Sequence, residues 1–244
     1  MAVYWILGSS SPVGTYLFNN LSLNNKVIGF CRNSSLINDK FLSIDFTNTI
    51  DFTNLIKNLL INNENYPTSV IFCQRFRNYS SDFIQDFLNA FQVEIQPVVI
   101  LRNLLYNIRR ENYNVSFIWL NSTAAYDNHI DINDAYHLIK ANCSRLCKLY
   151  SYHDRNIFSW NTITLGELSK FSYSNYNDEK LNIFDNIANF SNGNMISSLN
   201  DLLSVILFLS NQSNNLLSGQ DFNLNRGLNN LSVESILRRF IKNE

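Results

Sequence analysis

Tyr136 and Lys140, four residues apart, are the residues of this sequence best suited to acid–base chemistry. On a helix this spacing places both side chains on one face, one turn apart. A free tyrosine titrates near ~10, and a nearby ammonium group favours the phenolate and lowers that value. Such a tyrosine can act as general acid or base on a carbonyl or an alcohol. Ser122, fourteen residues upstream of Tyr136, offers a hydroxyl group that could hold the substrate oxygen.

The composition favours one α/β domain and argues against several kinds of partner. The 244 residues are 45% hydrophobic and 14% aromatic, which is enough for a sizeable core. A formal net charge of −1 gives no basic surface for nucleic acid. The N-terminus lacks the basic start of a signal peptide, and the longest apolar run, residues 202–209, is too short to span a membrane. We therefore expect a cytoplasmic protein with no nucleic-acid or membrane partner.

The four cysteines are scattered and do not form metal-binding pairs. Cys143 and Cys147 have helical spacing within an apolar stripe, whereas a zinc site favours tighter pairs with histidines nearby. Cys31 and Cys73 stand alone. We expect buried free thiols and no bound metal.

The Tyr-x-x-x-Lys spacing also occurs by chance in many helices, so its meaning depends on the elements around it. Residues 3–7 form an apolar run typical of a buried strand, and an amphipathic segment begins at Thr15. Between them, residues 8–14 carry two glycines, three serines and a proline. A glycine turn between a strand and a helix lets the backbone and the helix N-terminus approach a pyrophosphate. A purely structural turn would have much the same sequence.

Arg32 directly follows the second predicted strand, residues 26–31. In an open parallel sheet this position lies beside the adenosine ribose of a bound dinucleotide. An acidic residue there would bind the 2′-hydroxyl of NAD, whereas an arginine suits the 2′-phosphate of NADP. An ordinary surface arginine is an equally consistent interpretation.

Strands and helices alternate along the whole chain. Further strands are predicted at residues 41–46, 69–73, 115–120, 158–165 and 219–224. Helices are predicted at residues 51–62, 81–110 with a kink or break at Pro97, 135–153, 199–210 and 233–241. This alternation predicts a doubly wound parallel sheet with helices on both faces. No linker or repeat divides the chain, so we expect a single domain over residues 1–244.

The order of these elements and motifs resembles that of the short-chain dehydrogenase/reductases of the compact single-domain type. The resemblance covers essentially the full length and implies a Rossmann-type fold, a nicotinamide cofactor and oxidation of an alcohol or reduction of a carbonyl. It rests on these stretches: Gly8 to Gly14, Asp45, residues 121–125, Tyr136 with Lys140, residues 161–168, and Gly219-Gln220.

The resemblance also implies roles for individual residues. Tyr136 would be the general acid or base, Lys140 would lower its pKa and bind the nicotinamide ribose, and Ser122 would orient the substrate oxygen. Asp45 would bind the adenine amine, and the backbone of Leu168 the carboxamide. Tyr136 itself is also a cofactor-binding position, and the remaining ones implied by the resemblance are Gly8, Ser10, Ser11, Val13, Gly14, Phe46, Cys73 and Gln74, with Arg32 favouring NADP(H) over NAD(H).

The sequence departs from the family pattern at several positions. Pro12 replaces the middle glycine of the turn, and residues 73–76, Cys-Gln-Arg-Phe, replace an Asn-Asn-Ala-Gly run. Leu165 and Lys170 stand where a proline and a threonine are usual. Glu94 stands where the asparagine of the catalytic tetrad is expected. This last change puts the usual water-linked proton relay in doubt, although a glutamate could still pass a proton.

Three hypotheses follow from the sequence. The favoured one is an active NADP(H)-dependent oxidoreductase, and the alternatives are a catalytically silent dinucleotide-binding regulator or scaffold and a nucleotide-binding domain that uses no nicotinamide. Residues 170–198, rich in asparagine and tyrosine, are predicted to form a lid over the substrate. They suit a polar, hydroxylated carbonyl or alcohol substrate, but also an asparagine-rich sequence without functional meaning. The resemblance further implies a homodimer or homotetramer.

Overall fold

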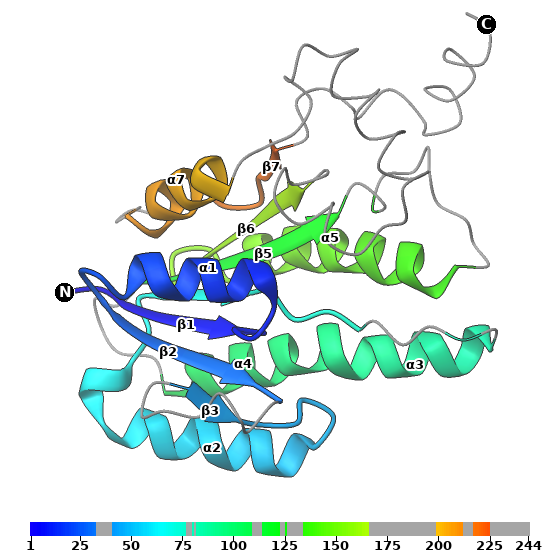
Figure 1. Ribbon diagram of the computed structural model, residues 1–244, viewed down its shortest axis with the longest axis horizontal. Coiled ribbons are helices and arrows are strands. Elements are labelled where there is room, and N and C mark those ends of the chain that lie inside the picture. Colours follow the sequence, from blue (N-terminus) through cyan, green and yellow to red (C-terminus); the bar gives the residue numbers. More distant parts are fainter. Residues whose placement is uncertain are drawn as a thin grey trace, which may run out of the picture.

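A seven-stranded parallel sheet organises the protein (Figure 1). The computed structural model describes residues 1–32, 41–76, 80, 82–108, 114–122, 125, 134–165, 199–211 and 217–224. The strands lie in the order β3-β2-β1-β4-β5-β6-β7, and every neighbouring pair is parallel. Their bounds are β1 (Val3–Leu7), β2 (Lys26–Cys31), β3 (Phe41–Ser43), β4 (Ser69–Phe72), β5 (Val115–Ser122), β6 (Phe158–Leu165) and β7 (Asp221–Leu224).

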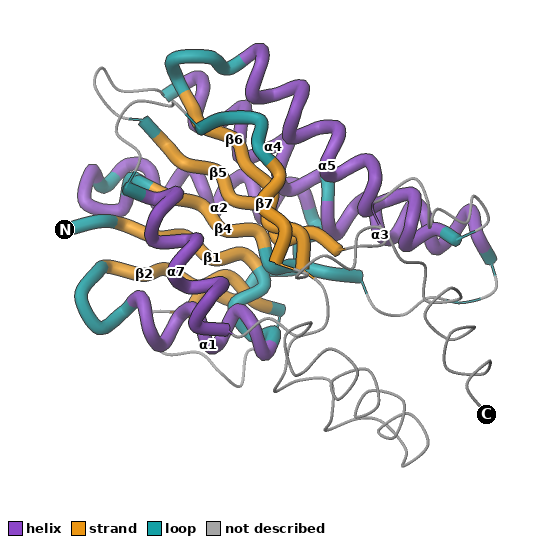
Figure 2. Tube along the Cα trace, turned by 90° about the horizontal axis from the view of Figure 1, so that it is seen from above, coloured by secondary structure: helices purple, strands orange, loops and turns teal. Residues whose placement is uncertain are grey.

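Helices cover both faces of this sheet (Figure 2). One face carries α1 (Pro12–Leu21) and α7 (Leu199–Ser210). The other face carries α2 (Thr49–Ile61), α4 (Gln96–Asn107) and α5 (Ala135–His153). Helix α3 (Phe83–Glu94) leads into α4 and packs against α5, and a short 3-10 helix, η2 (Asn63–Asn65), follows α2. The prediction of a doubly wound sheet is confirmed.

Alternate residues of the central strands build two separate cores, as a sheet buried on both faces requires. In β1, Trp5 and Leu7 join the core beneath α2, α4 and α5, whereas Tyr4 and Ile6 join the core beneath α1 and α7. In β5, Phe117 belongs to the first core and stacks on Trp160, with ring centroids 4.0 Å apart. The sheet is therefore held rigidly from both sides, and its carboxyl ends share one edge.

Several predicted element bounds needed correction. The predicted third strand, residues 41–46, ends at Ser43, because the Asp45 carboxylate accepts hydrogen bonds from the backbone and hydroxyl groups of Thr47 and forms a local turn. The first helix begins at Pro12 rather than Thr15, because Ser11 caps it. The last strand begins at Asp221 rather than Gly219, whose φ of 79° interrupts the extended backbone.

The predicted long helix over residues 81–110 is divided in two, as Pro97 suggested. Pro97 lies in the first turn of α4, where its missing N–H removes no helical hydrogen bond. Ile95 joins the two helices. The predicted lid at residues 170–198 and the terminal helix at 233–241 lie outside the described residues. Among the helices that are described, none has the length and apolarity needed to cross a membrane.

Candidate functional site

The glycine turn lies between β1 and the N-terminus of α1, at the carboxyl edge of the sheet. Gly8 has a φ of 81°, and a side chain there would come within 2.5 Å of the backbone nitrogen of Gln74. The hydroxyl of Ser11 caps α1 by accepting a hydrogen bond from the backbone N–H of Gly14, at 3.0 Å. The turn therefore needs glycine at position 8, both for its backbone conformation and for its close approach to the end of β4.

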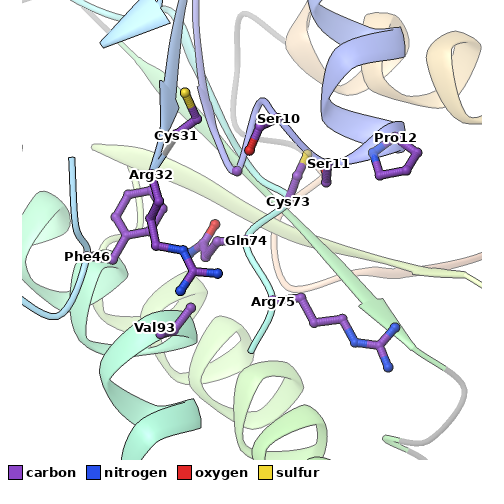
Figure 3. A pocket seen from close by; sticks show the side chains of 11 residues that line it. Ser10, Ser11, Pro12, Cys31, Arg32, Phe46, Cys73, Gln74, Arg75 and Val93 are labelled. Carbon is purple, nitrogen blue, oxygen red and sulfur yellow. The ribbon is translucent and has the colours of Figure 1, made fainter. Parts of the chain in front are cut away.

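A pocket of about 260 Å³ opens beside this turn (Figure 3). Its lining comes from the carboxyl ends of β1, β2 and β4 and from neighbouring elements, and consists of Gly8, Ser10, Ser11, Pro12, Cys31, Arg32, Phe46, Cys73, Gln74, Arg75 and Val93. The two charged lining residues are both arginines. In Figure 3 the Arg32 side chain extends between Phe46 and Val93, whereas Arg75 extends away from the glycine turn. The lining therefore favours an anionic ligand.

Gln74 gives a second indication that the pocket holds a polar ligand. Its Nε2 donates to the backbone oxygen of Glu94 at 3.4 Å, but its buried Oε1 has no hydrogen-bond partner within the described part of the chain. A buried acceptor without a partner costs free energy of about 1–3 kcal/mol. A ligand that donates a hydrogen bond here would remove that cost. A tight glycine turn, a helix N-terminus and Arg32 together fit a dinucleotide with its phosphates.

Tyr136 and Lys140 lie near the start of α5, with the Lys140 ammonium 5.6 Å from the centre of the Tyr136 ring. The helix begins there because the carboxylate of Asp134 accepts a hydrogen bond from the backbone N–H of Tyr136, at 2.8 Å. Ser122 is the last residue of β5. Its neighbour Asn121 donates from Nδ2 to the backbone oxygen of Lys140, at 3.0 Å. This bond ties the end of β5, and hence Ser122, to the helix that carries the tyrosine and the lysine.

Lys140 is almost fully buried and forms an ion pair with Glu94, the last residue of α3. The Glu94 Oε2 atom lies 2.5 Å from the Lys140 Nζ atom, and both side chains are at most 4% exposed. Glu94 Oε1 also accepts a hydrogen bond from the backbone N–H of Phe76, at 3.0 Å. Burial lowers the pKa of Lys140, but the effects of Glu94, Cys143 and Tyr136 together outweigh it, so the pKa of Lys140 is raised overall. Lys140 is therefore protonated, and its charge is compensated by Glu94, at neutral pH.

Arg75 joins the pocket to α5, the helix that carries Tyr136 and Lys140. It lines the pocket, and its guanidinium carbon lies 4.4 Å from the centre of the Tyr136 ring, within the range of a cation–π interaction. The pocket lining also includes four residues that were not among the predicted cofactor-binding residues: Pro12, Cys31, Arg75 and Val93. The signal for Arg75 was its place directly after Cys73 and Gln74, at the carboxyl end of a central strand.

The structure brings most of the predicted cofactor-binding residues into one pocket. Those that line it are Gly8, Ser10, Ser11, Arg32, Phe46, Cys73 and Gln74. Val13 and Gly14 lie in the first turns of α1, behind the lining. Asp45 is exposed and its carboxylate is bonded to Thr47, so its predicted contact with adenine stays a prediction. Leu168 lies outside the described residues.

The cysteines are buried or partly buried. Cys143 and Cys147 are buried free thiols, Cys31 is buried and lines the pocket, and Cys73 is a partly buried free thiol that also lines it. In the part of the chain that the structure describes, no three His, Cys, Asp or Glu side chains are grouped so that they could hold a metal ion.

Comparison with solved structures identifies the fold as that of the short-chain dehydrogenase/reductases. A short-chain dehydrogenase from Leptospira borgpetersenii with bound NAD+ superposes with a TM-score of 0.78 and 15% identity, over 93% of this chain and 92% of the other. The aldohexose dehydrogenase of Thermoplasma acidophilum gives 0.76 and 16% over 95% of each chain. ElxO with NADPH bound gives 0.69 and 14%, over 91% and 96% respectively. No protein-family model and no curated protein sequence matches this chain.

Proposed function

We propose that this protein is a short-chain dehydrogenase/reductase that transfers a hydride between NADP(H) and a carbonyl or alcohol substrate. The observation that carries the proposal is the placement of Tyr136 and Lys140 on α5, joined through Arg75 to the pocket at the glycine turn. Both lie at the carboxyl edge of one parallel sheet, where ligands of such sheets bind. The nicotinamide cofactor would supply or accept the hydride.

The protein's own part in the reaction is to hold the substrate oxygen and move one proton. In reduction, the hydroxyl of Tyr136 donates a proton to the carbonyl oxygen, and in oxidation Tyr136 takes the proton from the alcohol. Ser122, fixed at the end of β5, would hold the same oxygen through a hydrogen bond. Lys140 contributes a buried positive charge beside the tyrosine, but the Glu94 carboxylate compensates much of that charge.

The preference for NADP(H) rests on Arg32. We expect Arg32→Asp to weaken NADPH binding by roughly 10- to 100-fold, because a charge-assisted hydrogen bond contributes about 1.5–3 kcal/mol. NADH binding should weaken far less. Calorimetric titration of the protein and the variant with each cofactor measures both effects.

Arg145→Asp is the matched control for this experiment, since Arg145 is an exposed arginine of α5 outside the pocket lining. It should leave both affinities nearly unchanged. Equal, tight binding of NADPH and NADH by the unmodified protein would show that Arg32 does not set the cofactor preference, while the proposed oxidoreductase activity would stand. Failure to bind either cofactor would overturn the proposed function.

One observation favours a second candidate, a protein that binds the dinucleotide as a regulator or scaffold without redox chemistry. The ammonium of Lys140, which would bind the nicotinamide ribose, is already bonded to Glu94. Tight NADPH binding with no NADPH oxidation by a broad panel of carbonyl compounds would select this alternative.

We also propose that the protein forms a homodimer through α4 and α5. Both helices carry large apolar side chains on their outer surfaces, including Tyr106 at 38% exposure, Leu149 at 50% and Tyr152 at 70%. Exposed apolar side chains gathered on neighbouring helices are a common feature of interfaces between subunits. Sedimentation of the purified protein measures its oligomeric state.

A further inference from the structure

Two cations lie beside Tyr136, and they differ in their charge balance. Lys140 is buried and paired with Glu94 at 2.5 Å. Arg75 is exposed, and no carboxylate in the described part of the chain forms an ion pair with it. An arginine remains charged at all physiological pH values. Of these two described cations, Arg75 is therefore the one whose positive charge is uncompensated by a described carboxylate.

The geometry of Arg75 leaves it able to bind an anion. Its guanidinium lies over the face of the Tyr136 ring, 4.4 Å from the ring centre. A guanidinium group that stacks in this way keeps its N–H donors available at the edge, where they match the two oxygens of a carboxylate or phosphate. The ring thus holds the arginine in place before any ligand arrives, which reduces the entropy lost on binding.

Arg75 and Arg32 serve different parts of the site. Arg32 follows β2 and extends between Phe46 and Val93, on the side where the adenosine of a dinucleotide would lie. Arg75 extends away from Ser10 and Ser11 of the glycine turn (Figure 3). Its guanidinium lies over the ring of Tyr136. A cofactor whose phosphates bind at the glycine turn therefore leaves Arg75 to another anion.

We propose that Arg75 binds an ionised group of the substrate, a carboxylate or a phosphate, placed close to the carbonyl that is reduced. This inference rests on the proposed function, because Tyr136 marks the reacting carbon only if it is the acid or base. A guanidinium stacked on the reactive tyrosine places its anion within a short distance of the tyrosine hydroxyl. Small oxo acids and phosphorylated ketones have their charge that close to the carbonyl.

The test compares substrates that differ only in charge. Pyruvate is paired with methyl pyruvate, and hydroxyacetone phosphate with hydroxyacetone, so that the two pairs separate carboxylate from phosphate recognition. NADPH oxidation is measured for the unmodified protein, Arg75→Gln and Arg75→Lys.

We expect the charged member of at least one pair to have the higher kcat/KM. In Arg75→Gln its KM should rise about 10- to 100-fold, the effect of losing a charge-assisted hydrogen bond. The KM of the uncharged member should change little.

Arg75→Lys should restore part of the affinity, because lysine keeps the charge but not the two-pronged geometry. Arg145→Gln removes the same charge from an exposed position of α5 and should change neither member of a pair. If the unmodified protein turns over charged and uncharged compounds equally well, or if Arg75→Gln affects both equally, the inference is wrong while the proposed function stands.

A binding measurement keeps the inference testable if no compound is turned over. The complex with NADPH is titrated calorimetrically with the same four compounds. Binding of a charged compound that is lost in Arg75→Gln but not in Arg145→Gln supports the anion site even for a catalytically silent protein. Binding of none of the four compounds, or binding that is independent of Arg75, overturns the inference.

Discussion

Replacement of Tyr136 by Phe should lower kcat by about 10²- to 10⁴-fold, the usual contribution of a positioned general acid or base. The substitution removes only the hydroxyl group and keeps the aromatic ring on which Arg75 stacks. The pocket beside the glycine turn does not include Tyr136 in its lining. Cofactor affinity should therefore stay nearly unchanged, and steady-state kinetics together with NADPH titration separate the two effects.

Tyr152→Phe provides the control for this prediction. Tyr152 lies on the same helix, is 70% exposed and is remote in sequence from the start of α5. Its loss of a hydroxyl group should leave kcat unaltered. If Tyr136→Phe retains full turnover, the proton must come from elsewhere and the proposed mechanism is wrong.

Glu94→Ala should lower the free energy of unfolding by about 3–5 kcal/mol, because it leaves the buried ammonium of Lys140 without a partner. The Glu94 side chain is fully buried and accepts hydrogen bonds from both Lys140 and the backbone of Phe76. Urea-induced unfolding, followed by tryptophan fluorescence, measures the change. Glu94→Ala combined with Lys140→Met should be less destabilised than Glu94→Ala alone, since the double variant has no unpaired buried charge.

The exposed ion pair between Lys26 and Glu64 is the control for this stability prediction. Its atoms are 4.0 Å apart and the Glu64 side chain is 81% exposed. Glu64→Ala should therefore change the free energy of unfolding by no more than about 1 kcal/mol. Equal effects of Glu94→Ala and Glu64→Ala would show that the buried pair is not holding α3 against α5.

The pH dependence of the Glu94 effect follows from the raised pKa of Lys140. A group whose pKa is higher in the folded state stabilises that state fully below its unfolded pKa, which is 10.5 for this lysine. This contribution is lost as the pH rises through the folded pKa. In the unmodified protein this contribution should therefore be constant near neutral pH and be lost only in strongly alkaline solution. In Glu94→Ala burial lowers the pKa of Lys140 without the compensating carboxylate, so the difference in stability between the two proteins should begin to shrink at a lower pH.

Much of the fold could be predicted because the relevant signals are local. The strands β1 and β2 are largely apolar runs, and β1, β2, β6 and α5 all have the bounds that were predicted for them. The third strand was predicted too long because the side chain of Asp45 forms a turn with Thr47, and this turn competes with the extended backbone of the strand. The apolar residues from which the strand was predicted do not reveal such a turn.

The parts of the site that could not be predicted depend on contacts between distant segments. The sequence placed Glu94 at the position of an expected asparagine, but its pairing with Lys140 requires α3 to end beside α5. In the same way, the position of Arg75 over Tyr136 depends on where the chain goes after β4. Neither contact has a local sequence pattern, because nothing in the residues next to Arg75 or Glu94 specifies a partner from another element.

The junction between α3 and α4 connects the pocket with the helix that carries Tyr136. Glu94 is the last residue of α3. Its carboxylate accepts hydrogen bonds both from the backbone of Phe76, which follows the pocket residues 73–75, and from the ammonium of Lys140 on α5. A shift of the segment after β4 would therefore be transmitted to α5 through a single carboxylate. If the proposed dinucleotide binds in the pocket, its occupancy and the alignment of Tyr136 should be thermodynamically linked through this one interior contact.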